Sequence, residues 1–325
     1  GGVIEATVNG NGSKIINCDG TVAISGGKLI LANGGDYTLL NSVSGGTLEV
    51  ANGTTLVNNG KEITSSLVLA AGSAAEMNGS CVLKGAITVN NGAVLTFIGN
   101  GSDTLDWNTG NPITVDGGTI DFGNTRQSIG SWAITLKNGA LLTGTGENAN
   151  GSDFNVALDF YRDATINVTS GENTIAATSR LRDSNERTLT YNVSANAALN
   201  VTGRIHAGSA TATVGNVVKS GAGSVTISSQ VMLGKIKANA GDITVAYTGE
   251  GGNTVKSVVL SNGAELRVAE GASLNISNNA AFYSTTYTYP GAIDPGDTFY
   301  VLTAGYFPHV TPITPDGNYF YKDDF

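Results

Sequence analysis

Charged residues, proline and cysteine are all scarce in this sequence. Only 13% of its 325 residues are charged and 40% are hydrophobic, whereas disordered chains show the opposite balance. Glycine occurs 45 times, but six prolines and no triplet period exclude collagen. Cys18 and Cys81 are too few for a disulfide framework. The chain should therefore fold around a large apolar core, with the cysteines either as two small buried side chains or as one bridge.

Excess basic charge and long apolar runs are also missing. The formal net charge of −9 argues against a nucleic-acid partner and against an anionic membrane surface. No apolar run approaches the ~20 residues that a membrane helix needs, so we expect no membrane insertion. The chain begins at Gly1 with neither a methionine nor a signal-peptide pattern. We therefore expect that any targeting segment has already been removed.

Short strands bounded by glycine recur along the chain. The segment 45–57 (GGTLEVANGTTLV) alternates Leu48 and Val50 with polar residues, and a turn at Asn52-Gly53 follows. This period-two alternation predicts strands, and the Asn-Gly and Gly-Gly pairs predict corners because they tolerate positive φ. Helical spacing is nearly absent. Similar segments lie at 26–35, 85–101, 117–124, 133–146, 241–252 and 262–276.

Two all-β architectures fit short strands with frequent turns. A sandwich or barrel closes its strands into one globule, whereas a parallel β-helix coils them so that each turn stacks on the next. The repeats continue beyond the usual ~200–250 residues of one sandwich or barrel domain. The apolar residues are mostly of sizes that stack on copies of themselves at the ~4.8 Å strand spacing. We therefore predict a right-handed parallel β-helix, with about 13–16 coils at roughly 20–25 residues each.

One segment also resembles a known repeat. Residues 217–245 contain Lys219-Ser-Gly221-Ala-Gly223, an alternating apolar strand, and then a second strand that begins at Gly241. This order resembles the autotransporter-associated β-strand repeat, whose pattern runs lysine, a small polar residue, Gly-x-Gly, a strand, and a second glycine-led strand. The resemblance implies a parallel β-helix passenger exported by a Gram-negative-type bacterium. It says almost nothing about activity.

Only residues 217–245 match the repeat well, and a few other segments resemble it loosely. Residues 45–57 and 262–276 match the repeat in part, and 296–305 (GDTFYVLTAG) is similar to the segment that often ends such regions. The outer-membrane barrel of that family has no counterpart before Phe325. We therefore expect either a trimmed part of a longer protein or a secreted relative.

Histidine chemistry and metal binding have little support in the sequence. His206 and His309 are the only histidines and lie more than a hundred residues apart, so a surface or turn position is the simpler interpretation of each. Residues 99–105 fit most of the nonapeptide that binds Ca²⁺ in some β-rolls. That motif works in tandem, however, and here it stands alone with Ile98 in place of its first glycine. We predict no metal and no cofactor.

Paired carboxylates are the remaining route to catalysis. Many parallel β-helices cleave polysaccharides, and inverting glycosidases place two carboxyl groups ~6.5–9.5 Å apart. Asp159, Asp163 and Asp183 are the candidates on neighbouring coils. The motifs typical of polygalacturonase-type enzymes are missing, so we predict no catalytic residue and keep a polysaccharide-cleaving enzyme as the alternative.

An arginine-rich stretch interrupts the repeats between 144 and 196. Four of the seven arginines, Arg162, Arg180, Arg182 and Arg187, fall within it. They form either a solvated outer face of salt-bridged coils or an anion-binding patch, because guanidinium forks bind carboxylate or sulfate in pairs. The anion or glycan patch is the one binding site that we predict.

The C-terminal segment differs in composition. Residues 281–325 hold twelve of the twenty Tyr and Phe residues and five of the six prolines, which places a boundary near 280 between a β-helix (1–280) and a C-terminal capping segment. Aromatic rings can fill the open end of a coil, and prolines stop strand addition. A sugar-binding platform is the competing interpretation. The residues concerned are Phe282, Tyr283, Phe299, Tyr300, Tyr306, Phe307, Pro290, Pro295, Pro308, Pro312 and Pro315.

These observations favour a surface-displayed or secreted structural and adhesive module. We expect it outside the cell or attached to the outer membrane, as a monomer, with a host or environmental glycan or a surface protein as partner. A glycan-binding or glycan-cleaving protein on the same fold is the alternative. A passive stalk that spaces another domain from the surface cannot be distinguished from an adhesin by sequence.

Overall fold

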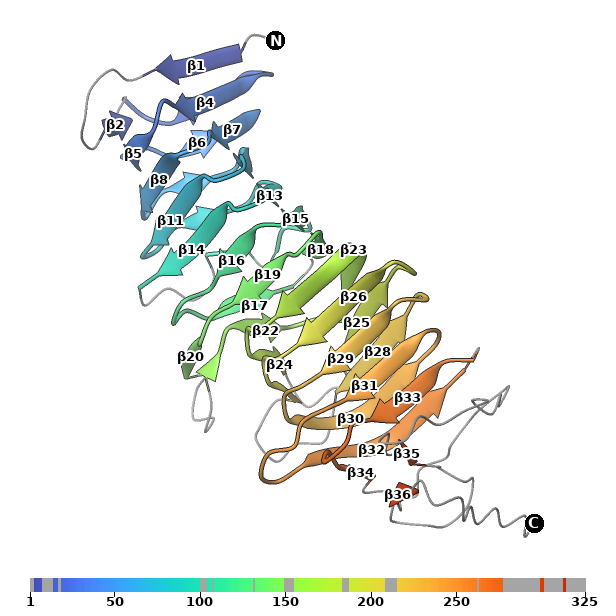
Figure 1. Cartoon of the computed structure of the whole chain (residues 1–325). Helices are drawn as coiled ribbons and strands as arrows, with labels where there is room; N and C mark the ends of the chain where they lie inside the picture. Colours follow the sequence, from blue (N-terminus) through green and yellow to red (C-terminus); the bar gives the residue numbers. More distant parts are fainter. Residues whose placement is uncertain are drawn as a thin grey trace.

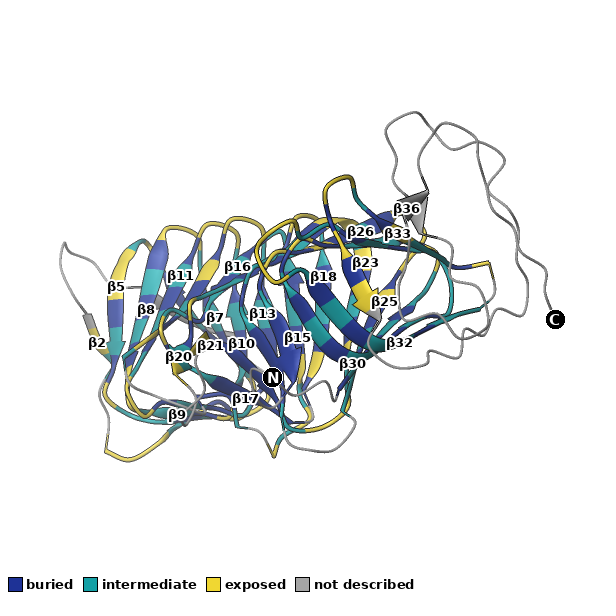
Figure 2. Cartoon of the chain, turned by 90° about the horizontal axis from the view of Figure 1, so that it is seen from below, coloured by how far each residue is buried: buried dark blue, intermediate teal, exposed yellow. Residues whose placement is uncertain are grey.

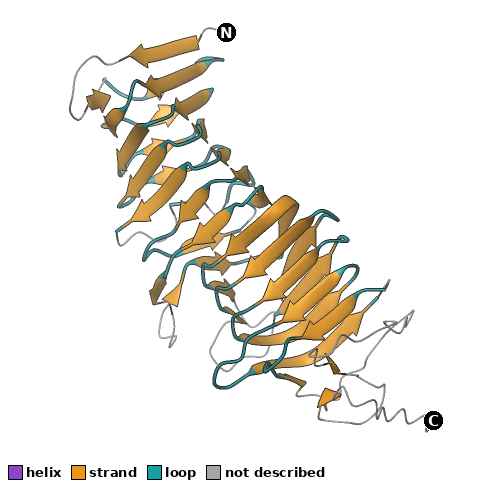
Figure 3. Cartoon of the chain, viewed as in Figure 1, coloured by secondary structure: helices purple, strands orange, loops and turns teal. Residues whose placement is uncertain are grey.

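The computed structural model shows an elongated coil of parallel strands (Figure 1). It describes residues 3–7, 14–16, 19–99, 104–106, 108–130, 132–148, 155–182, 187–207, 215–261, 263–276, 299–300 and 312–313. Within these ranges the secondary structure is entirely strands and turns, with no helix (Figure 3). The predicted all-β parallel coil is therefore confirmed.

Each turn of the coil contributes strands to three stacked faces. Face one consists of β1 (Val3–Thr7), β4 (Lys28–Ala32), β7 (Thr47–Val50), β10 (Ser66–Leu69), β13 (Ile87–Val89), β15 (Pro112–Asp116), β18 (Ala133–Lys137), β23 (Ala164–Ile175), β25 (Thr188–Val193), β28 (Asn216–Ser220), β30 (Val231–Ala238) and β32 (Asn253–Leu260).

Face two follows in each turn. It consists of β2 (Lys14–Ile16), β5 (Gly35–Leu39), β8 (Thr54–Asn59), β11 (Ala74–Asn78), β14 (Val94–Ile98), β16 (Thr119–Asp121), β19 (Leu141–Thr143), the second half of β23, β26 (Ala197–Val201), β29 (Ser224–Ile227), β31 (Asp242–Val245) and β33 (Glu265–Val268).

Face three has the shortest strands. It consists of β3 (Val22–Ala23), β6 (Val43–Ser44), β9 (Glu62–Ile63), β12 (Val82–Leu83), an isolated bridge at Leu105, β17 (Gln127–Ile129), β22 (Leu158–Phe160), β24 (Ser179–Leu181), β27 (Ile205–Ala207), the first residues of β30 and β32, and β34 (Leu274–Ile276). Two antiparallel pairs lie outside these faces: β20 (Glu147–Asn148) with β21 (Asn155–Val156), and β35 (Phe299–Tyr300) with β36 (Pro312–Ile313).

The described residues form about 11 turns, against the 13–16 predicted for the whole chain. Near the N-terminal end the turns are short and regular, since Leu29 pairs with Leu48 and Leu48 pairs with Leu67. Farther along the chain one turn is much longer, because Ile134 pairs with Ile166. The prediction counted all 325 residues, whereas the described coil ends with β34 at Ile276.

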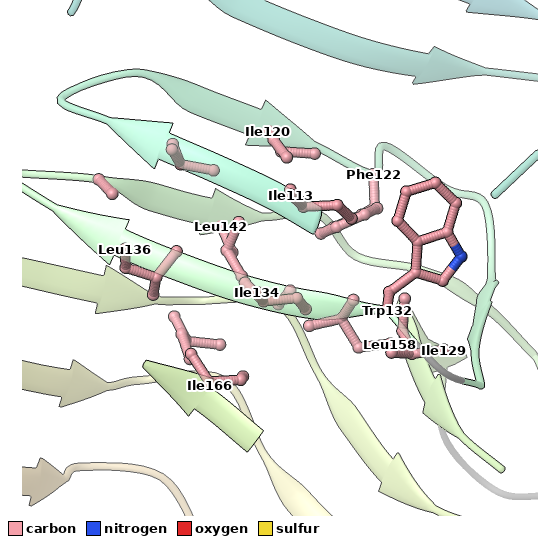
Figure 4. Packing of buried hydrophobic residues seen from close by; sticks show 14 of the residues in the cluster. Ile113, Ile120, Phe122, Ile129, Trp132, Ile134, Leu136, Leu142, Leu158 and Ile166 are labelled. Atoms are coloured by element: carbon pink, nitrogen blue, oxygen red, sulfur yellow. The ribbon is translucent and has the colours of Figure 1, made fainter. Parts of the chain in front are cut away.

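The core consists of inward-facing columns that run through successive turns. Along face one these side chains alternate with half-exposed outward ones, so every second residue is buried (Figure 2). Ile113, Ile134 and Ile166 are paired in register on neighbouring strands and pack together (Figure 4). Aromatic residues stack in the same way, since the Phe97 and Phe122 rings lie 5.5 Å apart at an interplanar angle of 13°. The core is thus filled by like side chains stacked on one another.

Glycines form the corners, as their spacing predicted. Gly46 has φ +48°, and a Cβ there would lie 2.4 Å from the carbonyl oxygen of Gly27 in the preceding turn. Both the left-handed backbone and the close approach of the neighbouring turn therefore require glycine.

The predicted boundary near 280 and the C-terminal cap fall largely outside the described residues. Phe282, Tyr283, Tyr306 and Phe307 lie there, as do all of the cap prolines except Pro312. For Phe299, Tyr300 and Pro312 the structure gives only the pairing of β35 with β36. The cap stays a prediction.

Candidate functional site

Face three carries a buried polar column on its outward side. Elsewhere outward residues are mostly exposed or half-exposed, but every residue of β17, β22, β24 and β27 is buried. Their outward positions are paired in register, Ser128 with Asp159, Asp159 with Arg180, and Arg180 with His206. A polar residue buried away from water needs partners. This buried polar column is therefore a candidate functional site.

Asp159 is the centre of an ion cluster. Arg180 binds it at two points, with Nε donating to Oδ1 at 2.9 Å and Nη2 to Oδ2 at 2.6 Å. Arg182 Nη1 lies 3.4 Å and Arg126 Nε 3.8 Å from the same Oδ2. Arg126 Nε also lies 3.5 Å from Oε1 of Glu147, which belongs to the β20–β21 hairpin. Among the described residues, three guanidinium groups thus gather around two carboxylates.

Arg180 and Arg182 differ in how far their side chains are exposed to solvent. The Asp159 side chain is fully buried and that of Arg180 is 7% exposed, so this two-point pair acts as an internal support. The Arg182 side chain is 25% exposed and lies over the Tyr161 ring, with its guanidinium carbon 4.0 Å from the ring centroid. The ring restricts the guanidinium on one side through a cation–π contact. Arg182 is therefore both held in place and open to solvent.

His206 continues the column beyond Arg180. Burial lowers the pKa of its imidazole to about 3, and the positive charges of Arg204 and Arg180 act in the same direction. The ring is therefore neutral near neutral pH.

The four predicted arginines do not share one environment. Arg180 and Arg182 meet at Asp159, whereas Arg162 is exposed after β22 and Arg187 is half-buried before β25. The prediction missed Arg126 and Arg204, each of which directly precedes a strand of face three. The signal was available, because six of the seven arginines lie between 126 and 204. The prediction considered only the arginines between 162 and 187, and so it left out Arg126 and Arg204.

Two of the three predicted carboxylates hold neighbouring parts of the coil together. Asp159 is buried against Arg180, while Asp163 is exposed and accepts a hydrogen bond from the Thr188 N–H at 2.9 Å. Asp183 lies outside the described residues. A general acid or base must reach its substrate within hydrogen-bonding distance, and Asp159 faces arginines.

The remaining candidates give no metal site within the described residues. His309, Cys18 and residues 100–103 of the calcium-like segment fall outside them. Cys81 is a buried free thiol whose Sγ lies 3.0 Å from the carbonyl oxygen of Asn58, and burial raises its pKa. Across the described ranges no three His, Cys, Asp or Glu side chains form a group that could hold a metal ion.

Lys219, the lysine of the repeat-like segment, points into the coil. It is fully buried, and its Nζ donates to the carbonyl oxygens of Ser220, Gly221 and Ala240 at 3.1, 2.6 and 2.9 Å. Burial lowers its pKa. A Cβ on Gly241 would lie 2.8 Å from that Nζ. The Lys-x-Gly-x-Gly order therefore builds a corner in which the ammonium group satisfies buried carbonyls.

Comparisons leave the family open. The described part of the chain forms no helix, so no helix there is long and apolar enough to cross a membrane. No protein family, no curated protein and no solved structure matches this chain. The structure supports the solenoid that the autotransporter resemblance implied, and membership of that family stays a prediction.

Proposed function

We propose that this protein is a structural and adhesive module, displayed on a bacterial surface or secreted, that binds an anionic ligand through the arginines around face three. The observation that carries the proposal is the Asp159 cluster, in which Arg126, Arg180 and Arg182 gather around one buried carboxylate. The resemblance of residues 217–245 to an exported repeat supports the location outside the cell.

The ligand-facing groups are the accessible arginines. Arg162 is exposed and Arg182 is half-buried, while Arg180 holds Asp159 and so fixes the strand from which Arg182 extends. Sulfated or acidic glycans suit such a site, because planar guanidinium groups recognise sulfate and carboxylate in pairs. Acidic surface proteins offer the same chemistry. Binding rather than cleavage is favoured, since the buried carboxylate of the cluster faces arginines.

The test is a binding screen of the purified chain against sulfated, sialylated and neutral glycans and against matrix proteins. Sulfated or sialylated ligands should bind, and binding should weaken steeply with salt because exposed charges are screened. The double variant Arg162→Gln and Arg182→Gln should lose that binding. Arg267→Gln is the matched control, because Arg267 is also exposed but lies on β33 beside Glu265 and Asp242. Equal binding by the double variant and the control would refute the assignment.

A further inference from the structure

A column of uncharged polar side chains runs along the outward side of face one. Six successive strands, β13, β15, β18, β23, β25 and β28, contribute one residue each (Figure 1). In order of pairing, these residues are Thr88, Thr114, Thr135, Asn167, Asn192 and Ser220. Because successive strands lie ~4.8 Å apart, the column is a straight row about 24 Å long.

The neighbouring outward column is small and also uncharged. It holds Pro112, Ala133, Thr165, Thr190 and Val218. Pro112, Ala133 and Thr165 are exposed, and the others are half-buried. Together the two columns form a strip that carries hydroxyl and amide groups on one side and mostly small side chains on the other. We call this the neutral strip.

Charged groups lie around the neutral strip but not in it. Toward the N-terminal end of the coil the same outward side carries the Lys28–Glu49 ion pair, 2.7 Å between Nζ and Oε2. Toward the C-terminal end Val218 pairs with Lys237. At the ends of β15 and β18 an ion pair between Asp116 and Lys137 marks one lateral edge. The absence of charge is therefore a property of these two columns over six turns and not of face one as a whole.

Three of the polar side chains of the neutral strip are already aligned by hydrogen bonds. Asn192 Nδ2 donates to Asn167 Oδ1 at 2.9 Å, and Ser220 Oγ donates to Asn192 Oδ1 at 3.4 Å. These contacts join Asn167, Asn192 and Ser220 from turn to turn, so these three side chains need little reordering when a ligand binds. Such preorganisation lowers the entropic cost of association.

We propose that the neutral strip binds an uncharged, extended, β-1,4-linked polysaccharide laid along the coil axis. A one-dimensional row with one hydrogen-bonding group per turn suits a linear polymer whose hydroxyl groups recur at a similar interval. Pro112, Ala133 and Val218 offer surfaces to the C–H faces of the sugar rings. A strip without charge has no electrostatic attraction for an anionic ligand, and it lacks the apolar centre that a protein partner of this size would need.

This site is separate from the arginine cluster of the proposed function. The neutral strip lies on face one and the cluster on face three. The two sites differ in their response to salt: binding at the neutral strip persists at high ionic strength, because no ion pair contributes to it.

The test uses the full chain with microcrystalline cellulose and soluble cello-oligosaccharides as probes. The triple variant Thr88→Val, Thr114→Val and Thr135→Val removes three hydroxyl groups and keeps the side-chain shape. It should bind at least about tenfold more weakly, since each lost hydrogen bond costs a several-fold change. The matched control is Thr96→Val, Thr226→Val and Thr244→Val, which alters half-buried outward threonines of face two. The control should bind like the parent, and circular dichroism of both variants checks the fold.

Three results would overturn the proposal. The first is no binding of the parent to either probe at any salt concentration. The second is equal loss, or no loss, in the triple variant and its control. The third is inhibition of ice growth without glycan binding, which would make the neutral strip a water-ordering surface. Loss of sulfated-glycan binding in the Arg162→Gln and Arg182→Gln variant, with cellulose binding intact, would separate this site from the arginine cluster.

Discussion

The turns before residue 99 and the turns between 112 and 233 are built from the same core but differ in their outer layer. In the early turns Leu29, Leu48 and Leu67 pair at short, equal intervals, and outward charges form exposed ion pairs such as Lys28 with Glu49. In the later turns the interval lengthens, as from 134 to 166, and the Asp159 cluster is buried on the outward side of face three. The extra residues of the later turns therefore add a buried ion cluster on the outside of the coil and leave its apolar core unchanged.

This comparison indicates where function can arise in a solenoid. The inward columns must match from turn to turn, because each turn buries its apolar side only against its neighbours. Insertions at the corners are tolerated, as the β20–β21 hairpin between β19 and β22 shows. The longest of these turns, from Ile134 to Ile166, carries Asp159, the centre of the arginine cluster.

The largest expected effect is at Asp159. Changing Asp159→Asn leaves Arg180 buried without a carboxylate, which should lower the free energy of unfolding by about 3–5 kcal/mol. Denaturant unfolding followed by circular dichroism measures the change. Asp163→Asn is the control, because its carboxylate is exposed and accepts one hydrogen bond; it should cost less than about 1 kcal/mol. Similar losses of unfolding free energy for both variants would mean that the buried cluster stabilises the fold no more than an exposed hydrogen bond does.

Acid should weaken the later turns through His206. Its pKa is about 3 in the folded protein against an ordinary 6.5. The unfolded chain therefore takes up a proton that the folded chain does not, and stability falls as the pH drops from 6.5 toward 3. The slope approaches about 1.4 kcal/mol per pH unit, so about 2 kcal/mol should be lost between pH 6.5 and 5.

The measurement compares unfolding at pH 6.5 and pH 5 for the parent and for His206→Asn. The variant should lose the slope that the histidine contributes, whereas His309→Gln should retain it. If His206→Asn kept the full pH dependence of the parent, another group would have to be responsible.

A corner of the early turns should be more sensitive than its exposed position suggests. Gly46→Ala places a Cβ 2.4 Å from the Gly27 carbonyl oxygen at φ +48°, so the backbone must shift as well as accept a strained conformation. We expect a loss of about 2–3 kcal/mol. Gly53→Ala shares the positive φ but meets nothing within 4 Å, and it should cost about 1 kcal/mol. Thermal midpoints of the two variants show whether crowding adds to the conformational cost.

The smallest effect is expected at the exposed ion pair of the early turns. Glu49→Gln removes the partner of Lys28 at a place where the two side chains are 23% and 44% exposed. Such pairs contribute about 0–1 kcal/mol. A loss comparable to that of Asp159→Asn would erase the proposed distinction between the two regions.

The coil could be predicted from the sequence because its signals are local. Alternation around Leu48 and Val50 and the Asn52-Gly53 corner were sufficient to place β7 and β8 and the turn between them. The Asp159 cluster was harder to predict, since Arg126, Asp159 and Arg180 belong to different turns and meet only through the register of face three. Turn lengths set that register, and no local pattern encodes the long turn from 134 to 166.

The neutral strip illustrates the same limit. Its strands share a short pattern, as in AIT (133–135) and PIT (112–114), which predicts strands with an outward threonine. Only the pairing shows that Thr88, Thr114 and Thr135 form one row. The local sequence pattern therefore predicts the strands, whereas the row of threonines follows only from how the strands pair.

Distances between spin labels along face one test the central claim most directly. In a Cys18→Ser background, where Cys81 is buried, a label at Lys28 is paired in turn with labels at Ala133, Thr165 and Val218. These positions lie five, six and eight strands away along face one. A parallel solenoid predicts distances of about 24, 29 and 38 Å, one strand spacing for each turn. Distances that fail to increase in this order, or that fit a closed sandwich with 28 and 218 near each other, would contradict the solenoid.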